Sequence, residues 1–134
     1  MSVLPLLMMP PDYCGPVCVP RALHCFSNRK LEKEGGWKVE VIDIRSLIPL
    51  DKEAIFESVK KTSKALVVHE DKVFSGFGAE LAAMIGTDMF RYLDGPVQRV
   101  GSTFTPVGFN PILEKEILPD EAKIYEAAKK LLEY

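Results

Sequence analysis

The chain has 134 residues, of which 47% are hydrophobic and 27% are charged, and its formal net charge is -2 with a pI near 5.7. This length suits one domain with a full hydrophobic core, and the composition is that of a globular protein. The balanced charge argues against a nucleic-acid or membrane surface, and the longest apolar stretches are too short to span a bilayer. Met1–Met9 is apolar but lacks a basic start and contains Pro5, so it makes a poor secretory signal. We therefore expect a cytoplasmic protein, or one of the mitochondrial matrix if the source is eukaryotic.

Residues 1–30 differ from the rest of the chain because they contain five of the ten prolines and all three cysteines. Proline removes a backbone donor and fixes φ, so no long regular element is expected in this leader. Short extended segments at Val3–Met8 and Val17–Val19 are predicted, in the manner of edge strands. A helix becomes possible from Ala22, and Gly35 and Gly36 would end it. We therefore divide the chain into an irregular leader, 1–30, and a domain, 31–134.

The leader also contains a candidate metal site, formed by Cys14, Cys18, His24 and Cys25. A zinc site needs four ligands that converge tetrahedrally, usually as two closely spaced pairs. His24 and Cys25 are adjacent, however, and adjacent side chains on a helix point about 100° apart. We therefore favour free, partly buried thiols in a reducing compartment and assign no metal site.

The stretch from Lys38 to Val68 predicts a strand, a helix and a second strand. Lys38–Ile44 is rich in β-branched residues, which point alternately to both faces of a strand, so we expect it inside a parallel sheet covered on both sides. Lys52–Thr62 predicts a helix with Asp51 as its N-cap. Ala65–Val68 is an uninterrupted apolar strand. Together these segments make a βαβ unit, whose crossover should be right-handed.

A histidine and two carboxylates, His69, Glu70 and Asp71, follow the apolar strand at its carboxyl end. This is the edge at which α/β proteins place their sites, and such a cluster could perform general acid–base chemistry. The sequence offers no convincing second half of a catalytic site, since His24 is the only other histidine. We therefore favour a structural role, in which the cluster bonds to its own loop or faces a neighbouring subunit.

A glycine pair, Gly76 and Gly78, opens the next predicted helix. A glycine-rich turn before a helix is where Rossmann folds bind dinucleotide phosphates, but a third glycine is missing at Leu81 and the turn follows the wrong strand. We favour the alternative that the glycines let the helix start close to the sheet. The helix itself is predicted by an apolar stripe at helical spacing, formed by Phe77, Leu81, Met84, Ile85 and Met89.

The last forty residues complete the predicted sheet and its cover. Leu93–Pro96 predicts a turn, and Val97–Val100 predicts a short strand. Residues 101–111 read as a loop with three large apolar side chains, Phe104, Val107 and Phe109, which should be buried, against another chain if not against this one. A closing helix is predicted after Asp120, with acidic residues at its start, basic residues near its end and an apolar stripe of Ile124, Ala127, Ala128 and Leu131.

Several of these stretches, taken in order, resemble the transketolase C-terminal domain, as found in the β subunit of 2-oxo acid dehydrogenase E1 components. The resemblance covers residues 31–134. The fold that it implies is a three-layer α/β/α domain with a mostly parallel sheet of about five strands. The leader resembles neither of the first two strands of the family, so either it contributes strands of its own or the chain is truncated or has an altered start, and the sequence itself predicts only the last three strands. The matching stretches are Val39–Leu47 with Pro49–Asp51, Leu66–Asp71, Gly76–Ala83, Asp94–Val100, Thr105–Pro106 and Leu118–Pro119.

The resemblance implies membership of an enzyme that depends on thiamine diphosphate, decarboxylates a 2-oxo acid such as pyruvate or a branched-chain acid, and transfers the acyl group to lipoyl-E2. In this family the cofactor and its Mg are held mainly by the α subunit, and catalytic groups of the β subunit lie in an N-terminal domain that this chain does not match. The resemblance therefore assigns no catalytic, cofactor-binding or metal-binding residue here. The chain is expected to be inactive alone and to bind no thiamine diphosphate.

The role implied instead is assembly with the E1 α subunit, a second E1 β subunit and the E2 dihydrolipoyl acyltransferase, in an oligomer. Asp94 and Tyr134 match positions used for E2 docking in related subunits. An acidic side chain and a terminal carboxylate would suit an arginine-bearing partner. Two alternatives stay open: a free-standing interaction module, and the same domain from a transketolase or a deoxyxylulose-phosphate synthase.

Overall fold

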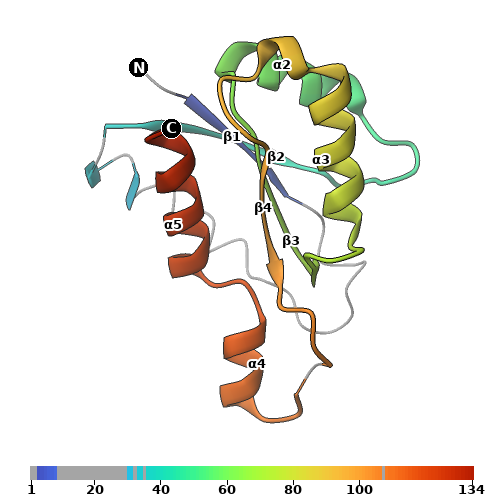
Figure 1. Cartoon of the computed structure of the whole chain (residues 1–134), viewed down its shortest axis with the longest axis vertical. Coiled ribbons are helices and arrows are strands. Elements are labelled where there is room, and N and C mark those ends of the chain that lie inside the picture. Colours follow the sequence, from blue (N-terminus) through green and yellow to red (C-terminus); the bar gives the residue numbers. More distant parts are fainter. Residues whose placement is uncertain (1–2, 9–29, 32, 35, 107) are drawn as a thin grey trace.

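The computed structural model describes residues 3–8, 30–31, 33–34, 36–106 and 108–134, and Figure 1 shows their arrangement. Residues 30–31 and 33–34 are helical. In the part described, strands alternate with helices along most of the chain, as an α/β domain requires. The elements are β1 (Val3–Met8), β2 (Lys38–Asp43), α2 (Lys52–Thr62), β3 (Leu66–Lys72), α3 (Phe77–Asp88), the 3-10 helix η2 (Phe90–Tyr92), β4 (Gln98–Ser102), α4 (Pro111–Ile117) and α5 (Glu121–Leu132).

The described strands form one sheet in the order β2-β1-β3-β4, and every pairing in it is parallel. The strand predicted at Val3–Met8 is therefore confirmed, but its expected position at an edge is wrong, because β1 lies between β2 and β3. Pro5 is in register with Glu40 of β2, whereas the register with β3 begins only at Leu6. The proline, which has no N–H to donate, thus precedes the β1–β3 ladder. Four parallel strands are described, where about five were expected.

The central position predicted for the Lys38–Ile44 strand is also wrong. β2 is an edge strand among the described elements, and Val41 is 41% exposed. Its two faces are nevertheless covered, since Val39 packs against one core cluster and Ile42 against the other. β-branched residues on both faces of a strand thus indicate that both faces are covered by helices. They do not indicate whether the strand has a neighbouring strand on one side or on both.

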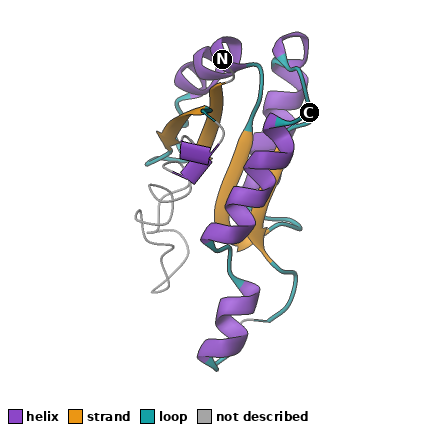
Figure 2. Cartoon of the chain, turned by 90° about the vertical axis from the view of Figure 1, so that its left-hand side faces the viewer, coloured by secondary structure: helices purple, strands orange, loops and turns teal. Residues whose placement is uncertain are grey.

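Helices cover both faces of the sheet (Figure 1), and a separate hydrophobic core lies between the helices and the sheet on each face. On one face α5 lies over the strands, as Figure 2 shows from its side, and it packs with Leu31, Leu66, Val68 and Val100. On the other face α2 and α3 pack with Val67 of β3 and with Ala65, the residue just before that strand. β3 has buried residues toward both cores, as expected for a strand inside a parallel sheet.

The helix ends follow local sequence signals. α2 spans Lys52–Thr62 as predicted, and the carboxylate of Asp51 accepts a hydrogen bond of 3.0 Å from the N–H of Ala54. α5 starts in the same way, since Asp120 accepts from the N–H of Lys123 at 2.8 Å. Each cap satisfies one of the four backbone donors that a helix N-terminus leaves without a partner.

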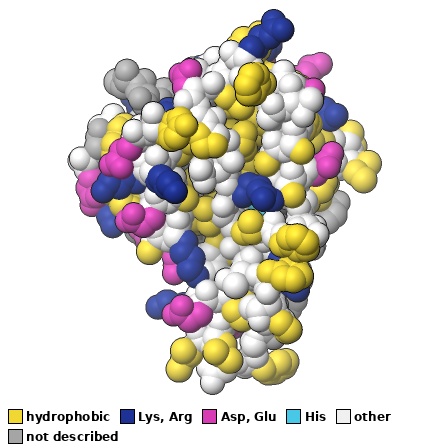
Figure 3. Space-filling view, viewed as in Figure 1, with side chains coloured by type: hydrophobic (Ala, Val, Ile, Leu, Met, Phe, Trp, Pro, Cys, Tyr) yellow, Lys and Arg dark blue, Asp and Glu magenta, His cyan; other side chains and the backbone are white. Residues whose placement is uncertain are grey.

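The segment after β4 differs most from the prediction. The loop expected at 101–111 is shorter than predicted, because β4 continues to Ser102 and the unpredicted helix α4 begins at Pro111, after its N-cap Asn110. Phe104 and Phe109 are exposed and not buried within the described chain, and the ring of Phe104 meets that of Phe74 edge to face at 4.9 Å. Figure 3 shows hydrophobic side chains on the surface over α4, at the lower end of the molecule.

Some predictions for the leader lie outside the described residues. They include the candidate metal ligands Cys14, Cys18, His24 and Cys25, the extended segment at 17–19 and most of the helix expected from Ala22. Among the residues that are described, no helix has both the length and the apolar character needed to cross a membrane.

Candidate docking surface

The carboxyl edge of the sheet contains the His69, Glu70 and Asp71 cluster. His69 is only 3% exposed, and neither of its ring nitrogens has a hydrogen-bond partner within the described part of the chain. Burial lowers the pKa of His69, and Arg99 adds to this effect while Asp71 opposes it. The ring of His69 is therefore enclosed and favours its neutral form.

The enclosure of His69 comes from three glycines. A Cβ atom on Gly78 would lie 2.2 Å from Nε2 of His69, and one on Gly76 would lie 2.9 Å from its Cε1. A Cβ on Gly101, in β4, would lie 3.0 Å from the same carbon. The glycine pair therefore lets the first turn of α3 lie directly on the imidazole, as the close-approach interpretation predicted.

Glu70 points away from His69, because neighbouring residues of a strand face opposite sides of the sheet. One of its carboxylate oxygens is buried without a hydrogen-bond partner in the described chain, and burial raises the pKa of Glu70 to about 7. Asp71 accepts a bond of 2.7 Å from the N–H of Lys72. His69 and Asp71 both approach Gly76, since a Cβ there would lie 2.9 Å from Cε1 of His69 and 3.1 Å from a carboxylate oxygen of Asp71, whereas Glu70 faces the other side of the sheet.

The described residues include no group of three His, Cys, Asp or Glu side chains placed to hold a metal ion. A pocket of about 290 Å³ lies where β2 ends and α2 begins, and its lining includes Ile42, Arg45 and Asp51. The Asp51 carboxylate already occupies the N-terminus of α2 there. None of the candidate catalytic residues lines this pocket.

The two candidate docking residues lie together near the amino edge of the sheet. Asp94, just ahead of β4, is exposed. Gly95 lies beside the last residue of the chain: a Cβ there would be 3.2 Å from Cδ1 of Tyr134 and 3.5 Å from Cδ1 of Leu131. Tyr134 is 77% exposed. Gly95, the residue after Asp94, thus contacts Tyr134 across forty positions of sequence, and we name the surface formed by Asp94, Gly95 and Tyr134 the Asp94–Tyr134 surface.

The segment 63–64 holds both parts of this surface by hydrogen bonds. The N–H of Asp94 donates to the carbonyl of Ser63 at 2.7 Å, and Nζ of Lys64 donates to the carbonyl of Leu131 at 2.9 Å. The sequence analysis missed Lys64 entirely. Its only signal in the sequence is its place directly ahead of the apolar run 65–68, where a buried cation requires a partner.

Comparison with known proteins agrees with this architecture. The family model for the transketolase C-terminal domain matches residues 19–124. The chain is 43% identical over 95 residues to the pyruvate dehydrogenase E1 component subunit beta of Rickettsia felis, which is 71% of this chain and 29% of that protein. It is 40% identical over 103 residues to the mitochondrial 2-oxoisovalerate dehydrogenase subunit beta of Dictyostelium discoideum, 77% of this chain and 27% of that protein.

Among solved structures, a chain described as a split gene transketolase, inactive beta4 tetramer, matches 98% of this chain and 39% of its own length, with a TM-score of 0.75 at 22% identity. This likeness shows the fold. The chain spans less than a third of the length of the curated relatives named above. With its parallel sheet and two helical layers, the chain belongs to the transketolase C-terminal domain family, and its relatives include E1 β subunits of pyruvate and 2-oxoisovalerate dehydrogenases.

Proposed function

We propose that this chain is the assembly domain of a 2-oxo acid dehydrogenase E1 β subunit. In the complete enzyme a 2-oxo acid would be oxidatively decarboxylated and its acyl group transferred to lipoyl-E2. The observation that supports this most strongly is the contrast between the two edges of the sheet. The carboxyl edge is closed by His69 under α3, whereas the amino edge presents exposed Asp94 and Tyr134, with Gly95 in contact with the tyrosine.

The partner proposed for the Asp94–Tyr134 surface is the subunit-binding domain of the E2 dihydrolipoyl acyltransferase. An exposed carboxylate next to an exposed aromatic ring suits an arginine, whose guanidinium can pair with the first and stack on the second. The E1 α subunit and a second E1 β subunit are the other proposed partners, in an oligomeric assembly of the cytoplasm or the mitochondrial matrix.

Thiamine diphosphate and Mg are proposed to act in the complete enzyme, away from this chain. The N-termini of three described helices do not suit a diphosphate, because each already has a carboxylate at or near it. Asp51 and Asp120 cap α2 and α5, and a Cβ on Gly76 at the start of α3 would lie 3.1 Å from a carboxylate oxygen of Asp71. Titration of the chain with thiamine diphosphate and Mg²⁺ should give no saturable binding, and tight binding would refute this assignment.

Charge reversal tests the docking role. Asp94→Lys should weaken binding of the E2 subunit-binding domain at least tenfold, because it places a cation against the partner's arginine. Glu116→Lys makes the same change in charge on α4, at the opposite end of the molecule (Figure 1), and should leave binding unchanged. Calorimetric titration measures both. Equal affinities for wild type and Asp94→Lys would show that Asp94 does not dock the partner.

A further inference from the structure

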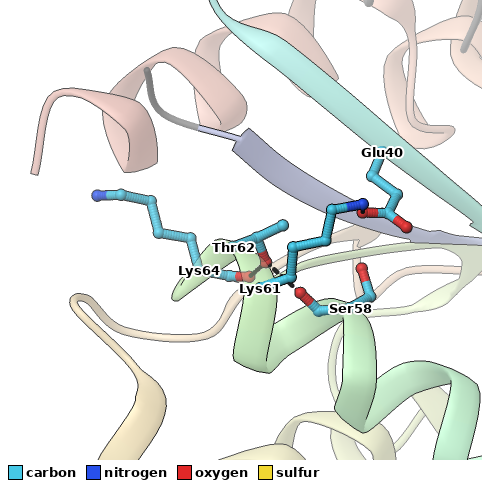
Figure 4. A network of polar contacts seen from close by, with 5 residues as sticks. All are labelled: Glu40, Ser58, Lys61, Thr62 and Lys64. Carbon is cyan, nitrogen blue, oxygen red and sulfur yellow. Dashed lines mark hydrogen bonds and ion pairs between the residues drawn. The ribbon is translucent and has the colours of Figure 1, made fainter.

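Two lysines near the end of α2 have opposite surroundings, as Figure 4 shows. Lys61 reaches toward β2, where its Nζ lies 2.9 Å from a carboxylate oxygen of Glu40, and its side chain is 65% exposed. Lys64 extends the other way and is only 9% exposed. A lysine so deeply buried is rare and needs a partner for its charge.

The partner of Lys64 is the end of α5. Its Nζ donates to the carbonyl of Leu131 at 2.9 Å, and Leu131 belongs to the last turn of that helix. The last four carbonyls of a helix have no partner within the helix, and they carry the negative end of its dipole. The ammonium group therefore holds the end of α5, three residues before Tyr134.

The backbone on which Lys64 sits is itself held in place. Thr62 donates its hydroxyl to the carbonyl of Ser58 at 2.6 Å and also lies 3.4 Å from the carbonyl oxygen of Lys64. Ser63 takes the left-handed conformation that ends α2, and its carbonyl accepts the N–H of Asp94. One three-residue turn, 62–64, thus contacts both halves of the Asp94–Tyr134 surface, one through its backbone and the other through a buried charge.

We propose that Lys64 is a positioning residue for partner docking, which sets Tyr134 at the distance from Asp94 that a basic partner needs. This inference rests on the proposed function. Lys64 is buried, and its charge interacts with a carbonyl at the end of α5. The charge therefore does not repel a cationic partner. Loss of the Lys64–Leu131 bond should free the end of α5 while the sheet and its cores stay intact.

The test replaces Lys64 by methionine, which keeps an unbranched apolar stem and removes the charge. Amide hydrogen exchange is measured first, without any partner. In Lys64→Met the amides of Glu133 and Asp94, which bond to Lys129 and Ser63, should exchange at least tenfold faster, while the amide of Val67 in β3 stays unchanged. Lys61→Met is the matched control and should alter none of these amides.

Affinity for the E2 subunit-binding domain is measured second. Lys64→Met should bind at least tenfold more weakly although Asp94 and Tyr134 are both present, and Lys64→Arg, which keeps a charged donor, should recover most of the loss. Exchange and affinity both equal to wild type would overturn the proposal. If Lys64→Met does not fold, Lys64→Gln replaces it with the same expectations.

The two proposals fail separately. A wild-type chain that does not bind the E2 domain refutes the docking function, whereas the exchange data still decide whether Lys64 holds Asp94 and the end of α5 together. Faster exchange with undiminished binding would show that Lys64 is structural only, and that result refutes the positioning role.

Discussion

Gly78 and His69 are packed so closely that no other residue fits at position 78. The first turn of α3 lies on the imidazole, and a single added carbon would lie 2.2 Å from Nε2. The contact joins a helix to the carboxyl end of the strand beneath it. It therefore fixes where α3 begins, and it leaves the His69 ring only 3% exposed at the edge of the sheet.

Gly78→Ala should destabilise the fold by about 1–3 kcal/mol, the usual cost of overpacking a buried site. Gly86, in the same helix, has no neighbouring heavy atom within 4 Å of its Cβ position. Gly86→Ala should stabilise by about 0.5–1 kcal/mol, since alanine favours helices. Urea unfolding measures both free energies. Similar values for the two variants would contradict the packing described for His69.

His69 should stay neutral in the folded protein at pH values where an exposed histidine is charged. Burial lowers its pKa from 6.5, so just below pH 6.5 His69 is protonated in the unfolded chain but still neutral in the folded chain. Above pH 6.5 the buried His69 therefore causes no loss of stability. As the pH falls from 6.5 toward the folded pKa, the free energy of unfolding decreases. Titration of the imidazole signals by NMR checks this, and a folded midpoint at or above 6.5 would be inconsistent with it.

Glu70 should act in the opposite pH range. Its pKa rises from 4.5 to about 7 because the side chain is partly buried, so its ionisation costs stability as the pH increases from 4.5 to 7. Glu70→Gln should be more stable than wild type at pH 8 by roughly 1 kcal/mol, less than the full shift implies because solvent screens a partly exposed group.

The advantage of Glu70→Gln should vanish near pH 4.5, and urea unfolding across pH 4.5–8 measures it. The exposed Glu116 offers a control, since Glu116→Gln should show no such trend. A constant difference between Glu70→Gln and wild type over this range would rule out the burial of the carboxyl group.

Asp51→Ala should destabilise by about 1 kcal/mol, because the first turn of α2 loses the acceptor that caps the N–H of Ala54. Asp51→Asn keeps an oxygen at the same place and should lose much less. Thermal unfolding of the two variants compares them. An equal loss in both would mean that the charge of Asp51, and not its capping bond, stabilises the helix.

The sequence was sufficient where the signal is local. Asp51 and Asp120 mark the starts of α2 and α5, and the apolar stripe of α5 identifies its buried face. α4 also had a local signal that was overlooked, since Asn110 followed by Pro111 is a favoured N-cap and first-turn pair. This signal is weak by itself, because no residue of α4 is buried and the helix therefore has no apolar stripe in its sequence.

Features that depend on distant residues could not be predicted. The insertion of β1 between β2 and β3 is a choice among pairings that Val3–Met8 alone does not encode. The sequence likewise gives no distance between Lys64 and Leu131, which lie 67 positions apart. Asp94 and Tyr134 were identified by resemblance, and only the fold shows that Tyr134 packs against Gly95, the residue after Asp94.

Partner binding by this chain is the central expectation. Calorimetric titration of the wild-type chain with the E2 subunit-binding domain should give saturable heats, because the Asp94–Tyr134 surface is already assembled in the chain. A flat titration, with no heat beyond dilution at any ratio, would contradict the proposal that this domain serves assembly.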